Sequence, residues 1–147
     1  MDLVLFLLII LALHAIIAGL LFATLKFGLS ADVKYKTVFA VVIFASLPGL
    51  LKALLAILSL VAGASADSFT FANPIATNPG YFVDPAAHPI LYSFLTSFDV
   101  FTIWTLVLTA IGLTCITKIK SGTAHAVVFG WFAVAILMGV GAAAIFS

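Results

Sequence analysis

The chain has very few charged residues and a single cysteine. Charged residues make up 7% of its 147 residues, and all six basic ones are lysine. A soluble domain carries about a quarter charged residues, so this chain lacks the polar side chains to cover a water-facing surface. With no arginine and a net charge of +1, it also lacks the basic patch and planar fork that bind nucleic acid. Because Cys115 is the only cysteine, the chain can form neither an internal disulfide nor a thiolate metal cluster. Its apolar neighbours indicate that Cys115 is a small packing residue.

Sequence signatures of catalysis and metal binding are also absent. The chain has no G-x-S-x-G elbow, no P-loop and no H-E-x-x-H motif. Its three histidines, His14, His88 and His125, never fall at the i, i+3 or i, i+4 spacing of paired metal ligands on a helix. We therefore expect no enzyme, no metal site and no cofactor. His14 as an axial ligand of a haem or chlorophyll is the less favoured alternative.

Long apolar runs dominate the chain, since 65% of its residues are hydrophobic. Four segments approach or exceed the roughly 20 residues that cross a bilayer core as a helix. No segment shows the sustained alternation of a barrel strand, so the sequence predicts an all-α, polytopic membrane bundle forming one domain. The four predicted transmembrane helices cover residues 3–25, 38–62, 100–116 and 126–146.

The lysines predict the orientation of these helices. Five of them flank the first and third loops: Lys26, Lys34, Lys36, Lys118 and Lys120. The second loop, residues 63–98, contains Asp67 and Asp84 but no basic residue. By the positive-inside rule, the first and third loops are cytoplasmic, and both termini and the second loop face outward.

The second loop is too long and too apolar for a plain linker. It contains four X-Pro pairs and an Asn-Pro-Gly turn signal. Asp84 followed by Pro85 is typical of the N-cap and first residue of a helix, which we expect to run to about Leu95. The loop is predicted to lie on the outer face of the bundle, with this short helix in the interface.

A cation and a helix breaker interrupt the second apolar segment. Lys52 lies about ten residues, roughly 15 Å, from its outward end, too deep for its stem to reach the interface. His14 lies at a similar depth in the first segment. Pro48 kinks the helix one turn earlier and frees the carbonyl of Phe44. A lysine facing lipid costs about 2.5–3.5 kcal/mol on insertion scales, so we expect Lys52 to face inward.

The third segment offers acceptors for Lys52. A polar and small stripe follows one helical face: Asp99, Thr102, Thr105, Thr109 and Gly112. We expect Lys52 to bind these threonines, the freed carbonyl or Asp99, which should lie nearer the outer surface. With His14, these groups form the predicted intramembrane polar cluster. A structural tie is favoured over a pocket for lipid or a partner, and both over transport, which usually needs several midplane charges and paired broken helices.

The last segment carries small residues at three- and four-residue spacings. They are Ala126, Gly130 and Ala133, and again Ala135, Gly139 and Ala143. Such spacings let another helix approach closely, so Gly130, Gly139 and Gly112 are predicted packing positions. One neighbouring helix would use only one of these two faces of small residues. The second face therefore predicts other membrane helices as partners, in a homo-oligomer or a larger complex.

Several stretches resemble the bacterial branch of the Yip1 family of membrane proteins. They are "VFAVVIFASLPGLLKALLAIL", "NPGYFVDP" and "SFDVFTIWTLVLTAIGLTCITKIKSGTAHAVVFGWF". The similarity extends from about Gly19 to the C-terminus. Its most specific part is the run from Asp99 to Trp104, together with Gly112 and Lys118.

The resemblance implies a bundle of usually five helices with a cytoplasmic N-terminus, in the bacterial inner membrane. Eukaryotic relatives act in vesicle traffic and contact prenylated Rab GTPases. This chain departs from the family in lacking a cytosolic N-terminal segment, a first helix and the Asp-Leu-Tyr-Gly-Pro motif, so Rab binding is not expected. The resemblance favours a non-enzymatic scaffold or a lipid-organising protein. The alternatives are a small accessory subunit of a respiratory or photosynthetic complex and, third, a transporter.

Overall fold

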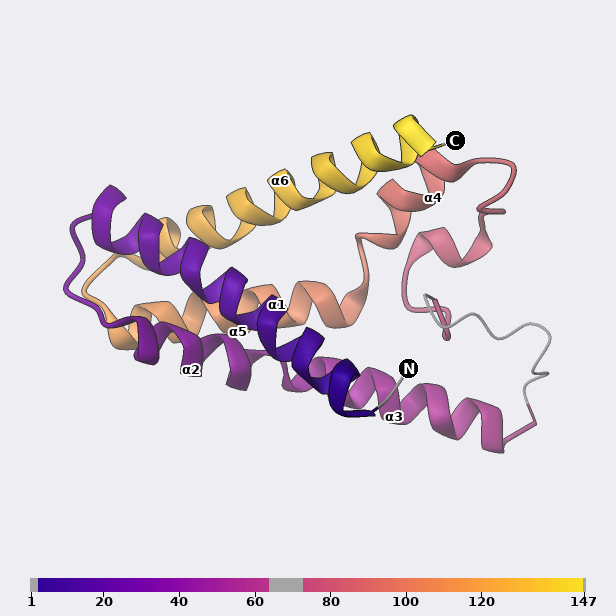
Figure 1. Ribbon diagram of the computed structural model, residues 1–147, viewed down its shortest axis with the longest axis horizontal. Coiled ribbons are helices and arrows are strands. Elements are labelled where there is room, and N and C mark those ends of the chain that lie inside the picture. The colour runs from indigo at the N-terminus through magenta and orange to yellow at the C-terminus, as the bar shows by residue number, and fades with distance from the viewer. Residues whose placement is uncertain (1–2, 64–72, 147) are drawn as a thin grey trace. The chain divides into compact units, whose positions relative to one another are not determined.

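The computed structural model describes residues 3–63 and 73–146, and every regular element in them is helical (Figure 1). The predicted all-α class is confirmed. Residues 64–72 of the predicted outer loop, including Asp67, lie outside the described residues. The elements are α1 (Leu3–Ala23), a π-helical turn η1 (Thr24–Gly28), α2 (Tyr35–Ala45), α3 (Leu47–Val61), a 3-10 turn η3 (Pro79–Phe82), α4 (Pro89–Thr96), α5 (Val100–Ile116) and α6 (Ser121–Phe146).

Three helical stretches are long and apolar enough to cross a membrane. They are Val4–Gly28, Tyr35–Val61 and Ser121–Phe146, and each exceeds the roughly 20 residues that a bilayer core requires. The fourth predicted helix is different, because α5 has 17 residues and meets the same criterion only together with α4. These two helices are bent by 46° at the break between them, as in a broken span or a re-entrant loop. The described residues therefore contain three candidate spans, or four if the bent pair counts as one.

The second span is interrupted next to Pro48. Helix α2 ends at Ala45, and α3 begins at Leu47, one residue before the proline. Pro48 has no N–H to donate to the Phe44 carbonyl, so the regular ladder stops there. Ser46 satisfies part of the open turn: its N–H bonds the carbonyls of Val42 and Ile43, and its hydroxyl donates to Ile43 at 2.7 Å.

Four predicted boundaries differ from the structure by three residues or more, among them the start of the second helix, which is Tyr35 instead of residue 38. The loop helix begins at Pro89, not at Pro85: Asp84 accepts the Ala86 N–H at 2.8 Å in a local turn, and Pro89 keeps His88 out of the helical region. The first helix continues as a π-helical turn to Gly28. The last helix begins at Ser121, although its apolar run and its prediction begin at residue 126. The first turn of a helix is formed by backbone hydrogen bonds and does not require apolar side chains.

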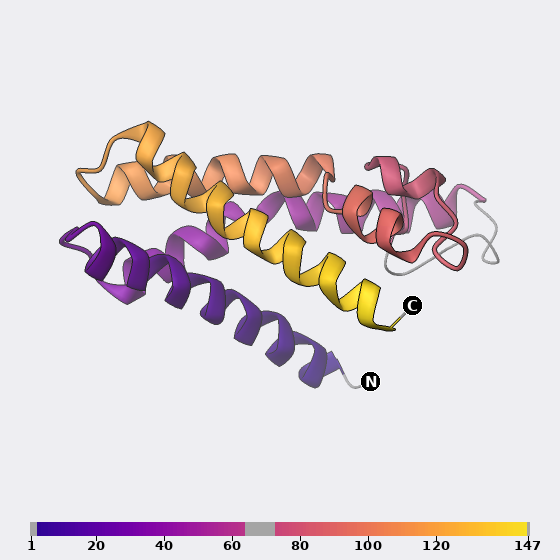
Figure 2. The ribbon, with the colours of Figure 1, turned by 90° about the horizontal axis from the view of Figure 1, so that it is seen from above.

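The chain divides into two compact units. Unit 1 comprises Met1–Ser46 and Leu106–Phe129, and in it α1 packs beside α2 (Figures 1 and 2). The Tyr35 hydroxyl donates to the Ala15 carbonyl at 2.9 Å, and its ring meets Phe22 edge-on at 5.9 Å. Aliphatic side chains fill the contact, with Leu25 and Val38 fully buried. Cys115, predicted to be a small packing residue, is exposed.

Unit 2 comprises Leu47–Thr105 and Gly130–Ser147. In this unit the turn η3 packs directly on the C-terminal end of α4, where Gly80 meets Thr96. The ring of Phe98 contacts Phe94 at 5.1 Å and Phe132 at 6.5 Å, both in tilted or edge-on geometry. Unit 2 thus brings the outer loop, α3 and the start of α5 together, and these three segments supply the polar cluster described next.

Candidate functional site

Asp99 is the centre of the polar cluster, and its first role is to cap α5. One carboxylate oxygen, Oδ1, accepts the backbone N–H groups of Phe101 at 3.0 Å and Thr102 at 3.3 Å. The Asp99 carbonyl accepts the first intrahelical bond, from Ile103 at 2.9 Å. The first N–H groups of a helix have no partner within the helix, and their dipoles favour a negative charge at this position. The carboxylate of Asp99, directly before α5, supplies both the hydrogen-bond acceptor and the negative charge.

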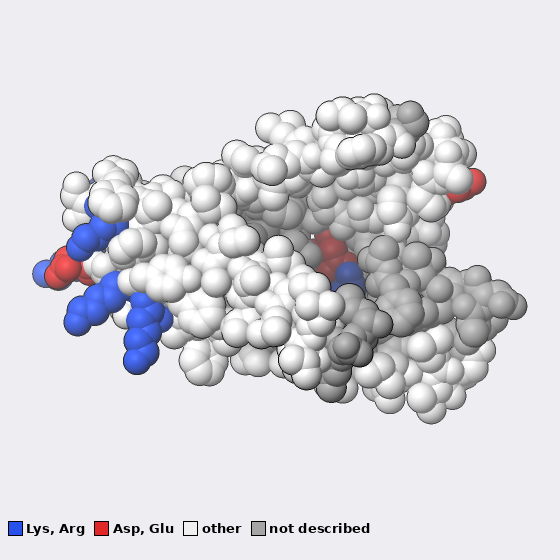
Figure 3. Space-filling view, viewed as in Figure 1, with Lys and Arg blue, Asp and Glu red and all other residues white. Residues whose placement is uncertain are grey.

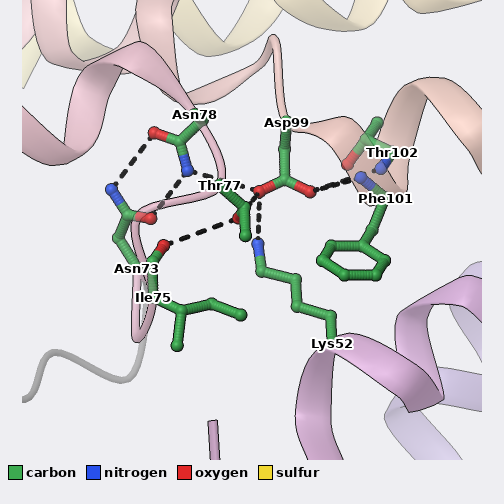
Figure 4. A network of polar contacts seen from close by, with 8 residues as sticks. All are labelled: Lys52, Asn73, Ile75, Thr77, Asn78, Asp99, Phe101 and Thr102. Carbon is green, nitrogen blue, oxygen red and sulfur yellow. Dashed lines mark hydrogen bonds and ion pairs between the residues drawn. The ribbon is translucent and has the colours of Figure 1, made fainter. Parts of the chain in front are cut away.

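The second carboxylate oxygen joins α3 to the outer loop (Figure 4). Oδ2 accepts the ammonium of Lys52 at 2.8 Å and the amide of Asn78 at 3.3 Å. The hydroxyl of Thr77 donates to the same oxygen. Asp99 is 2% exposed and receives five hydrogen bonds, which uses the acceptor capacity of a carboxylate fully.

Two asparagines hold the loop segment in place. Asn73 and Asn78 form a reciprocal amide pair, in which the Asn78 amide donates at 2.7 Å and the Asn73 amide at 3.3 Å. Both side chains are buried, and each precedes a proline that restricts its backbone to extended conformations. The backbone N–H of Val100 also donates to the Thr77 carbonyl at 3.1 Å. The segment from Asn73 to Asn78 is therefore fastened to the beginning of α5.

Lys52 projects from α3 into this network with 24% of its side chain exposed. Of the three kinds of acceptor considered for it, Asp99 forms a hydrogen-bonded ion pair with it. In the part of the chain that the structure describes, no buried side-chain nitrogen or oxygen lacks a partner. The charges of Lys52 and Asp99 thus balance each other within the chain.

The remaining predicted members of the cluster have other places. His14 lies on α1 in unit 1 and hydrogen-bonds through Nδ1 to the Ile10 carbonyl, at 2.7 Å within its own helix. The prediction that it joins Lys52 is not supported by these contacts. Thr102 contributes its backbone N–H to Asp99. Thr105 belongs to unit 2 and the buried Thr109 to unit 1, so the threonine stripe is divided between the units.

The three predicted packing glycines differ. A Cβ at Gly112 would lie 2.6 Å from Cγ1 of Val41 on α2, so this glycine permits a close helix contact inside unit 1. A Cβ at Gly139 would lie 3.6 Å from the hydroxyl of Ser93, an ordinary contact. Gly130 has no atom within 4 Å of that position. The role of Gly130 as a packing position therefore stays a prediction, for a helix that does not belong to the described contacts.

Sequence reasoning did not include Asn73, Thr77 and Asn78 in the site. The available signal was the repeated Asn-Pro in "ANPIATNPG", two amides with fixed backbones in an apolar loop. Only the prolines of that stretch and its Asn-Pro-Gly turn signal entered the prediction. Buried amides require partners, and in this loop the nearest strong acceptor is the carboxylate of Asp99.

The chemistry available at this cluster is that of a neutralised ion pair. The described residues contain no group of three or more His, Cys, Asp or Glu that could hold a metal ion. Comparisons with protein-family models, with curated proteins and with solved structures find no match to this chain. Its function must accordingly be argued from the site and the helices themselves.

Proposed function

We propose that this chain is a non-enzymatic membrane protein of the Yip1 type, a scaffold that organises lipid or partner helices. The observation that carries this proposal is the saturated carboxylate of Asp99. A transport or catalytic site needs a charged group that can exchange partners, whereas all the acceptor positions of Asp99 already have donors from the chain itself. The pair of Asp99 with Lys52 then acts as a tie between helices and loop.

The proposed topology has four spans, with α4 and α5 together forming the fourth. Their 46° bend at the break would place Asp99 within a broken span, where a partner for the buried charge is most needed. The lysine-flanked loops would face the cytoplasm, and both termini and the part of the loop 63–98 that precedes α4 would face the periplasm, in a bacterial inner membrane.

Cysteine labelling tests this topology. In a Cys115→Ala background, needed because the native thiol is exposed, Lys34→Cys and Lys120→Cys should react with a membrane-impermeant maleimide only after the cytoplasmic side is opened. Asp84→Cys should react in intact spheroplasts, because its loop has no basic residue to retain it inside. Reaction of Asp84→Cys from the cytoplasmic side alone would reverse the orientation.

A second candidate function is that of an accessory subunit in a larger membrane complex. It is favoured by α6, in which Ala124 and Val128 are the buried residues of a 26-residue helix. Gly130 has open space beside it, so another helix could approach the backbone there.

Photo-crosslinking in native membranes distinguishes the two functions. A photoreactive residue at Gly130 should give a homodimer adduct if the chain is a self-associating scaffold, and an adduct with a different protein at constant stoichiometry if it is an accessory subunit. The same residue at Ile16, which is 60% exposed on α1, is the matched control and should give lipid adducts.

Lipid adducts alone at both positions would contradict the partner-organising role. The third reading, a transporter, has its own outcome: ion or proton flux in proteoliposomes above that of protein-free vesicles, lost in Lys52→Met while the protein remains folded. The scaffold predicts a flux equal to the protein-free background.

A further inference from the structure

The lysines of unit 1 form one basic surface. Five exposed lysines belong to it, and we call them the lysine end: Lys26, Lys34, Lys36, Lys118 and Lys120. Figure 3 shows Lys side chains in blue gathered on unit 1, over the η1–α2 and α5–α6 connections located in Figure 1. Two loops that are more than 80 residues apart in the sequence thus contribute to a single surface of unit 1.

The chain leaves this surface strongly positive. The lysine end contains one acidic residue, Asp32, which lies 4.0 Å from the ammonium of Lys26 and is itself fully exposed. Five positive charges against one negative charge give a net charge of +4 here, although the whole chain carries +1. An exposed pair at that distance contributes little, so the remaining charge must be neutralised by something outside the chain.

The position of the lysine end indicates what neutralises it. Its lysines lie at or beside the ends of the spans Val4–Gly28, Tyr35–Val61 and Ser121–Phe146, the depth at which the headgroups of a bilayer lie. Phe27, which is 79% exposed, and Tyr35, which is 40% exposed, stand among them. Aromatic rings next to lysines are typical of residues anchored in the interfacial region. Lipid phosphates are therefore unavoidable neighbours of these ammonium groups.

We propose that the lysine end is a binding surface for anionic phospholipid headgroups, selecting phosphatidylglycerol-type lipids over zwitterionic ones. This goes beyond the scaffold function, and it holds for either orientation of the chain, because the charges lie at the membrane surface in both. A lysine near an anionic surface contributes roughly fivefold to association, equivalent to about 1 kcal/mol. Two loops acting together should give a clear preference.

The test measures lipid association directly. The full chain is reconstituted in phosphatidylcholine vesicles, and the motionally restricted fraction of spin-labelled phosphatidylglycerol is compared with that of spin-labelled phosphatidylcholine. We expect a several-fold preference for phosphatidylglycerol at low salt and its reduction in about 1 M salt, where the Debye length is about 3 Å. Lys118→Gln with Lys120→Gln should reduce the preference towards equal association of the two lipids.

A charge-gain pair keeps the test decisive if the lysine variant does not fold. Asp32→Asn adds one net charge at the lysine end and should increase the preference, whereas Asp84→Asn makes the same change in unit 2 and should leave it unchanged. Equal association of both lipids at low salt, or equal effects of the two asparagine variants, would overturn the proposal.

Two competitors identify the source of the bound phosphate. Inorganic phosphate at constant ionic strength should not erase the preference; if it does, the surface binds the free anion rather than a lipid. A soluble polyglutamate peptide should not displace phosphatidylglycerol either. Displacement by the peptide would assign the lysine end to an acidic protein partner and overturn the lipid proposal.

Discussion

Asp99→Leu is expected to destabilise the protein by about 3–5 kcal/mol, whereas Lys52→Met should destabilise it distinctly less. The two residues form one ion pair, but they depend on it unequally. Without Lys52, Asp99 retains the hydroxyl of Thr77, the amide of Asn78 and two backbone N–H groups of α5. Without Asp99, the ammonium of Lys52 loses its counter-ion and the first turn of α5 loses its cap.

The measurement is the free energy of unfolding in mixed micelles, and two further variants separate the causes. Asp99→Asn keeps an oxygen for capping and should fall between the two single variants. Lys52→Met combined with Asp99→Leu should be more stable than Asp99→Leu alone, because the double variant has no half-buried lysine without its counter-ion. A loss from Lys52→Met as large as that from Asp99→Leu would show that Asp99 cannot remain buried without its counter-ion.

The helices could be predicted from the sequence because the signals for them are local. Apolar length identified the three candidate spans, and α5 has the same limits as its prediction, Val100–Ile116. The interruption near Pro48 likewise follows from one residue's missing N–H. Where two local signals competed, the prediction failed: Asp84-Pro85 and His88-Pro89 both look like helix starts. Only the second pair begins α4, because a proline cannot donate to the turn before it.

The polar cluster could be predicted only in part, because its partners are distant in the sequence. Lys52 and Asp99 were recognisable as unusual charges in an apolar chain. They could be paired by their opposite signs although 47 residues separate them in the sequence. Thr77 and Asn78 lie 22 and 21 residues from Asp99, in a loop whose path no periodicity describes. Their place depends on the fold of the loop against α5, which is a matter of packing rather than of local sequence.

Two glycine contacts are expected to give the second-largest effects. Gly112→Ala and Gly80→Ala should each destabilise the protein by about 1–3 kcal/mol, since the added methyl overlaps a neighbour in a packed contact. At Gly112 the new Cβ would lie 2.6 Å from Cγ1 of Val41, and at Gly80 it would lie 2.5 Å from Cγ2 of Thr96. Gly130→Ala is the control: with open space beside it, alanine should be neutral or stabilising by up to about 1 kcal/mol.

The nature of the neighbouring atoms predicts which of the two losses can be repaired. Around Gly112 the three nearest atoms all belong to the side chain of Val41, so Val41→Ala should restore most of the stability lost in Gly112→Ala. Around Gly80, the backbone nitrogen of Thr96 lies 2.7 Å from the new Cβ and its Cα 3.1 Å away. Thr96→Ser removes the clashing methyl but keeps both the backbone and the hydroxyl that donates to Tyr92.

Thr96→Ser should therefore fail to rescue Gly80→Ala, and unfolding in micelles measures both double variants against their single parents. The two pairs should differ because the backbone of Thr96 cannot be shortened by a substitution, whereas the side chain of Val41 can. Full recovery of Gly80→Ala by Thr96→Ser would show that η3 moves freely on α4, and the outer loop would then be held mainly by its hydrogen bonds to Asp99. Failure of Val41→Ala to rescue Gly112→Ala would contradict the close approach of α2 and α5 within unit 1.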